Sequence, residues 1–136
     1  MNKIPANINI DTLLNEYQKK TKCNITKLNY LRDGMIYFLS RLTLDNYNQI
    51  KYKDGYIHLQ NSILERIIGK ERPTIIHKIL KSNGIIETKP YSQGHRSTGY
   101  RLTDSYRTGE FIEVVFSERI KTKLSEDDVN THTCFI

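Results

Sequence analysis

The spacing of apolar residues predicts two helices in the first third of the chain. Residues 26–45 step by three and four between apolar positions, which is the spacing of one helix face; these positions are Leu28, Leu31, Met35, Phe38 and Leu42. Before them, Asp11 is a suitable N-cap for a shorter helix through about Lys20. Residues 1–10 alternate Asn with Ile around Pro5, so we expect an extended arm there.

The long apolar face of residues 26–45 has two interpretations. In the favoured one, this helix is the first helix of the domain core. In the other, the heptad-like stripe is the seam of a homodimer, although two heptads are too few to establish a coiled coil. Both interpretations stay open at the level of sequence.

Turn, strand and helix signals follow one another closely in the middle of the chain. Asp54-Gly55 predicts a tight hairpin turn, because such a turn needs positive φ at both central positions. Residues 56–59 then fit a short strand. Ser62 and Glu65 match a capping box, which predicts a helix over residues 62–68.

A second short helix is predicted over residues 73–83. Pro73 is tolerated in its first turn, and Gly84 accepts the left-handed conformation that ends a helix. Helical spacing places four apolar side chains on the inward face: Ile75, Ile76, Ile79 and Leu80. The opposite face then carries Thr74, His77, Lys78, Lys81 and Ser82.

The helix is followed by the pattern of a hairpin. Residues 85–89 fit a strand, residues 90–98 a polar loop and residues 99–103 the returning strand. Residues 111–116 predict another strand or extended segment, and residues 117–124 a short helix. We expect the last dozen residues to be loose.

The composition is that of an ordinary soluble protein. A chain of 136 residues fits one domain, and 38% hydrophobic with 26% charged residues is typical of a folded one. No apolar run approaches the roughly 20 residues of a membrane span, and the start of the chain lacks the apolar segment of a signal peptide. Cys23 and Cys134 form no disulfide framework, so we expect a cytoplasmic protein without membrane contact.

The net charge of +6 is concentrated in residues 66–107. This stretch holds nine Lys or Arg against three Asp or Glu, whereas the remainder of the chain holds twelve of each. A neutral chain with one cationic segment indicates an anionic partner, and DNA is the most common partner for this arrangement.

The predicted order of helices, strands and basic loop is that of a winged helix-turn-helix. Residues 56–103, with SILERIIG, TIIHKILKSNGIIE and GYRLT in turn, resemble the winged-helix modules of bacterial, phage and plasmid DNA-binding proteins. The resemblance implies an α+β fold, a winged helix-turn-helix with an N-terminal helical extension and a small antiparallel β-sheet. It divides the chain into an arm and helices over 1–50, a DNA-binding core over 51–107, and a C-terminal strand, helix and loose tail over 108–136.

The resemblance also implies a site and a function. In helix-turn-helix proteins the second helix enters the major groove, and its amino end can receive a phosphate. Long cations on the hairpin suit phosphates or a narrow minor groove. The DNA-binding residues expected here are Arg72, Thr74, His77, Lys78, Lys81, Lys89, His95, Arg96 and Arg101. The implied function is sequence-specific binding of double-stranded DNA, as a transcriptional regulator or replication initiator of a bacterium or mobile element.

Other interpretations of the same residues remain open. Lys78 and Lys81 also fit a merely solvated helix face, and Arg101 also fits an ion pair with Glu87 across the hairpin. The alternative function is that of a winged-helix adaptor that docks on a protein in a phage or replisome complex.

The chain carries no recognisable catalytic motif. The four histidines show no metal-ligand spacing with one another or with the cysteines. There is no Gly-rich phosphate loop and no GxSxG elbow in the sequence. We therefore expect no catalysis, no metal and no cofactor.

Overall fold

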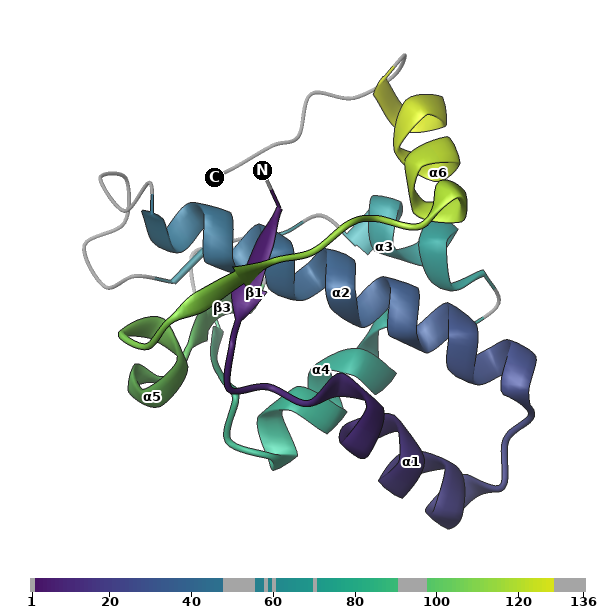
Figure 1. Ribbon diagram of the computed structural model, residues 1–136, viewed down its shortest axis with the longest axis horizontal. Helices are drawn as coiled ribbons and strands as arrows, with labels where there is room; N and C mark the ends of the chain where they lie inside the picture. The colour runs from purple at the N-terminus through teal and green to yellow at the C-terminus, as the bar shows by residue number, and fades with distance from the viewer. Residues whose placement is uncertain are drawn as a thin grey trace.

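The structure, a computed structural model, describes residues 2–47, 56–57, 59, 61–69, 71–90 and 98–128. These residues form an α+β fold of six helices and two small antiparallel sheets (Figure 1). The helices are α1 (Ile10–Thr21), α2 (Ile25–Tyr47), α3 (Asn61–Ile68), α4 (Pro73–Ser82), α5 (Asp104–Arg107) and α6 (Glu118–Asp128). The strands are β1 (Lys3–Pro5), β2 (Ile86–Pro90), β3 (Thr98–Leu102) and β4 (Phe111–Glu113).

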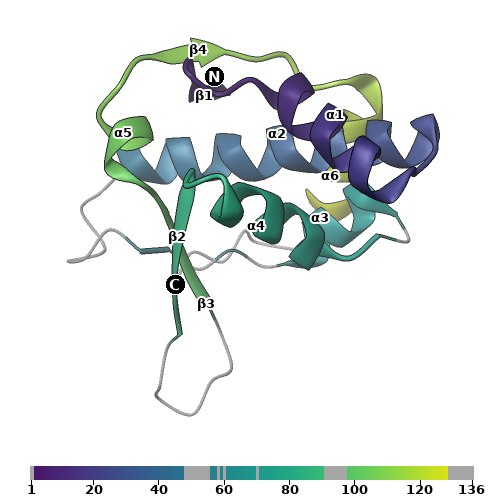
Figure 2. The ribbon, with the colours of Figure 1, turned by 90° about the horizontal axis from the view of Figure 1, so that it is seen from below.

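Helix α2 is the central element of the fold. Strands β1 and β4 lie on one side of it, and α3 and α4 lie on the other (Figure 2). Its apolar stripe is at most 2% exposed: Leu28, Leu31, Met35, Phe38 and Leu42. The core interpretation of this helix is therefore confirmed. The same side chains do not form a dimer seam, because the chain's own elements already cover them.

The backbone of α2 is approached closely by both following helices at Gly34. A Cβ atom at this position would lie 2.3 Å from Cγ2 of Ile68 in α3 and 2.6 Å from Cδ1 of Ile76 in α4. Both isoleucines are fully buried. A glycine here lets α3 and α4 pack directly on α2, which sets the position of the surface that α4 presents to solvent.

The N-terminal ten residues are not a free arm. Strand β1 pairs antiparallel with β4, with Ile4 opposite Ile112, and Ile4 is buried. The expected extended conformation is found in β1, but its pairing with β4 was not predicted, because the partner strand lies more than 100 residues away and leaves no local signal. Helix α1 is capped by Asn9, whose side chain accepts a hydrogen bond from the Thr12 amide at 3.1 Å, so Asp11 is not the cap.

The C-terminal helix α6 is longer than predicted and is fixed to the rest of the chain. Arg119 donates hydrogen bonds to Asp33 Oδ2 at 3.1 Å and to the Ile67 carbonyl. Its guanidinium also lies 4.0 Å from the centroid of the Tyr30 ring. Residues 125–128, expected to be loose, therefore belong to a docked helix, whereas residues 129–136 lie outside the described part.

The segment from α3 to β3 follows the predicted order of elements. Gly69 (φ +69°) ends α3, and Gly84 (φ +71°) follows α4, both in the left-handed conformation. Helix α3 already includes Ser62, so the predicted capping residue lies in its first turn rather than at its N-cap. Strands β2 and β3 pair antiparallel and project away from the helices (Figure 2). Of the short strand predicted over 56–59, Ile57 forms an isolated bridge to Tyr100, and the Asp54-Gly55 turn lies outside the described residues.

One hydrophobic core joins the N-terminal, central and C-terminal parts of the chain. Its buried members run from Ile4 through Leu64 and Leu80 to Ile120. The predicted segments 1–50 and 108–136 thus share this core with the central one. Within the described residues, no helix is both long and apolar enough to cross a bilayer.

Candidate nucleic-acid interface

The exposed edge of α4 carries four of the residues predicted to bind DNA. Thr74, Lys78 and Lys81 are exposed along the helix, and Arg72 is exposed at its N-cap. Within the described part of the chain, no acidic side chain pairs with any of these three cations. Arg72 is the N-cap residue of α4, and the first turn of this helix holds no acidic residue, so the Arg72 charge and the positive end of the helix dipole lie together.

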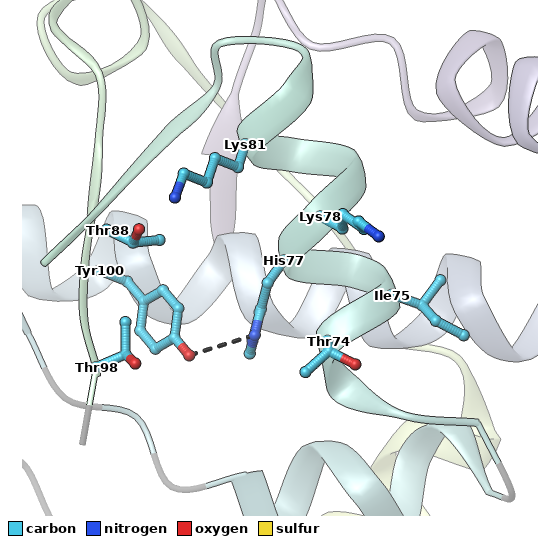
Figure 3. Close-up of a pocket in the computed structure, with 8 residues that line it drawn as sticks. All are labelled: Thr74, Ile75, His77, Lys78, Lys81, Thr88, Thr98 and Tyr100. Carbon is cyan, nitrogen blue, oxygen red and sulfur yellow. Dashed lines mark hydrogen bonds between the residues drawn. The ribbon is translucent and has the colours of Figure 1, made fainter. Parts of the chain in front are cut away.

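A hollow of about 470 Å³ lies between α4 and the β2–β3 hairpin. It is lined by Thr74, Lys78 and Lys81 from the helix and by Thr88, Thr98 and Tyr100 from the hairpin (Figure 3). Lys81 extends from α4 toward Thr88, whereas Lys78 extends away from the hairpin (Figure 3). The two lysines therefore serve different parts of the same surface.

His77 does not point outward as the sequence predicted. It is only 9% exposed, and its Nδ1 atom lies 3.2 Å from the Tyr100 hydroxyl. Its ring packs 4.9 Å from the ring of Phe38 in α2. The physical reason is that Pro73, Ile76, His77 and Leu80 follow the i, i+3, i+4, i+7 spacing of one helix face, and this face packs into the core.

The buried position keeps His77 uncharged at neutral pH. Burial penalises the protonated imidazole and lowers its pKa from 6.5 to about 4. Its Nε2 atom is buried and has no hydrogen-bond partner among the residues that the structure describes. Burial also raises the pKa of the Tyr100 hydroxyl, which therefore stays protonated. This neutral pair ties α4 to β3 beneath the hollow and adds no charge to it.

The two faces of the hairpin differ in their chemistry. Thr88 and Tyr100 are directly paired across the strands, and side chains opposite each other lie on one face of a sheet. Glu87 and Arg101 are the neighbouring pair, so they lie on the other face. There, Arg101 Nε donates to Glu87 Oε2 at 2.6 Å. The simpler interpretation of Arg101, an ion pair across the hairpin, is confirmed.

The continuous cationic surface expected from the sequence is therefore divided by the hairpin. The Arg101 guanidinium lies 4.4 Å from the centroid of the Tyr56 ring, and Lys89 Nζ lies 5.6 Å from the same ring. Both cations lie on the face turned away from the hollow. They are therefore separated from Lys78 and Lys81. His95 and Arg96, predicted at the tip of the hairpin, lie outside the described residues.

Four residues of the hollow were not predicted as site residues from the sequence: Ile75 of α4 and three residues of the hairpin. Thr88, Thr98 and Tyr100 reach the hollow because β2 and β3 pair in the observed register. Their alternation with Glu87 and Arg101 was visible, but which face turns toward α4 depends on that register. Among the residues that the structure describes, no three His, Cys, Asp or Glu side chains gather as a metal ion requires.

The arrangement is suited to contact with an anion. It combines exposed ammonium groups with hydroxyl donors, and a neutral pair lies beneath. No protein-family model, curated protein or solved structure matches this chain. Function is accordingly inferred from these residues and their arrangement.

Proposed function

We propose that this protein binds double-stranded DNA as a winged helix-turn-helix. In this proposal α3 and α4 form the helix-turn-helix, α4 is the recognition helix, and the β2–β3 hairpin is the wing. The observation that carries the proposal is the exposed edge of α4. Arg72, Lys78 and Lys81 lie there without acidic partners in the described part, beside a projecting hairpin.

The shape and the charge of α4 both support the proposal. An α-helix fits the major groove of B-DNA, in which each base pair presents a distinct set of donors and acceptors. Thr74 and Lys78 lie on the outer edge of α4, where they suit contact with base edges. Arg72 precedes the first turn and suits a phosphate, because the helix dipole adds to its charge.

The role follows from the absence of a catalytic motif in the sequence. A protein that binds duplex DNA without altering it fits a transcriptional regulator or a replication initiator. The abundance of Ile, Lys and Asn in the sequence favours an AT-rich source such as a phage, a plasmid or a bacterium of low GC content. Sequence specificity is assigned to the groove-facing side chains of α4.

The test is a titration of fluorescently labelled duplex DNA at several salt concentrations. One phosphate contact each from Arg72 and Lys81 predicts that the logarithm of the binding constant falls with the logarithm of salt with a slope of about −1.8, since each contact releases condensed counterions. Absence of binding even at about 50 mM salt would rule out the proposal. That result would favour the adaptor function, in which the same surface contacts a protein.

A further inference from the structure

We propose that the hollow between α4 and the β2–β3 hairpin seats one phosphate group, held by Lys81 and Thr88. This inference rests on the proposed function, because the phosphate is taken to be a phosphodiester of the bound DNA. A free phosphate anion has the same chemistry and is distinguished by the experiment below.

The donors come from both walls of the hollow. Lys81 is exposed on α4 and extends toward Thr88, which is half-buried on β2 (Figure 3). Thr98 is half-buried on β3 and lines the same hollow beside Tyr100. The Lys81 ammonium and the Thr88 hydroxyl supply donors from the two walls, which is what the oxygens of a phosphate group require, whereas the Thr98 side chain hydrogen-bonds to Tyr100.

The surroundings favour an anion over a cation. Glu87, the acidic residue of the described part of the hairpin, lies on the opposite face and pairs with Arg101. Beneath the hollow, the Tyr100 hydroxyl and His77 Nδ1 contact each other at 3.2 Å, and both residues are buried. This contact joins the helix to the hairpin, so the two walls that carry the donors are held together before a ligand arrives.

Lys78 provides a matched comparison for Lys81. Both are exposed lysines of α4 and lie about one helical turn apart. Lys78, however, extends away from the hairpin (Figure 3). Changing either to Gln removes the same single charge. Because Lys78 also lies on the proposed DNA-binding surface, the two variants are compared through the effect of neutralising single phosphates and not through their overall affinities. A phosphate whose effect disappears in Lys81→Gln and persists in Lys78→Gln is assigned to Lys81.

The experiment uses the full chain and the tightest duplex obtained by selection in vitro. Each phosphate of that duplex is replaced in turn by a neutral methylphosphonate, and affinities are measured for the wild type, Lys81→Gln, Lys78→Gln and Thr88→Val. Thr88→Val changes no charge and suits a β-strand, so its fold is expected to persist. Thermal unfolding of each variant is recorded as the control for folding.

We expect one phosphate to behave differently from the others. Its neutralisation weakens the wild type and Lys78→Gln by about tenfold but has little further effect on Lys81→Gln, in which the charged contact is already lost. In Thr88→Val the effect is intermediate, because the Lys81 contact remains. Thr88→Val alone weakens binding by about three- to tenfold. If neutralising any one phosphate changes the affinity equally in all four proteins, the proposed phosphate site is disproved, whereas the proposal of DNA binding is unaffected.

A second arm separates this inference from the proposed function. If no duplex is bound at all, inorganic phosphate is titrated into isotope-labelled protein while the backbone amide signals of Thr88 and Lys81 are followed. Shifts confined to the hollow would support the seat with a free anion as its ligand. No shift there, together with no DNA binding, would overturn both proposals.

Discussion

Replacing both Lys78 and Lys81 with Ala is expected to weaken binding to duplex DNA by about a hundredfold at low salt. Each ammonium group contacts a charged or strongly polar acceptor, and loss of such a hydrogen bond costs about 1.5 kcal/mol, or about tenfold in affinity. Each phosphate contact that is lost also reduces, by about 0.9, the steepness with which the logarithm of the binding constant falls with the logarithm of salt. Both side chains are exposed, so the free energy of unfolding is expected to change by less than about 0.5 kcal/mol.

A matched double variant controls for the loss of two positive charges. Lys19 and Lys20 are exposed in the last turn of α1, outside the surface formed by α4 and the hairpin. Replacing them with Ala lowers the net charge by the same amount and is expected to change affinity only slightly at physiological salt, where the field is screened over about 8 Å. Equal losses in the two double variants would show that α4 is not the contact surface.

Lowering the pH from 7 to 4 is expected to remove about 3 kcal/mol of stability through His77 alone. Its pKa is about 4 in the folded protein, against 6.5 when the chain is unfolded. Between these values the unfolded chain binds more protons than the folded one. The contribution of His77 to the free energy of unfolding is therefore complete above pH 6.5. It falls as the pH drops toward the pKa of the folded state.

The measurement is urea-induced unfolding at a series of pH values for the wild type and for His77→Leu. Other groups also titrate in this range, so the quantity to compare is the difference between the two proteins. This difference is expected to change by about 3 kcal/mol between pH 7 and pH 4, with His77→Leu less sensitive to acid. Parallel curves for the two proteins would show that His77 is not buried as observed.

The helices of this fold were predictable because their signals are local. The stripe from Leu28 to Leu42 has helical spacing, and the same side chains prove to be buried. Gly84 was predicted to follow the end of a helix, and it adopts positive φ. These features depend on neighbours within a few residues, which the sequence displays directly.

The errors concern features that depend on distant parts of the chain. For α4, the apolar residues fit either of two stripes, one through Ile75 and Ile79 and one through Pro73 and His77. Packing against α2 and β3 selects the second and buries His77. Likewise, the pairing of β1 with β4 joins segments more than 100 residues apart.

The composition of the candidate site depended on strand register. Sequence alone grouped Lys89 and Arg101 with the cations of α4, because all are close along the chain. A shift of one residue in a strand moves every side chain to the other face. The observed register turns Thr88 and Tyr100 toward α4 instead.

The most direct test of the central claim is to map the surface that DNA touches on the isotope-labelled protein. We expect duplex DNA to shift the amide signals of α4 around Thr74, Lys78 and Lys81, together with those of Thr88 and Thr98 in the hairpin. The signals of β1, β4 and α6 should stay in place. Shifts concentrated on those three elements, with α4 unaffected, would contradict the account.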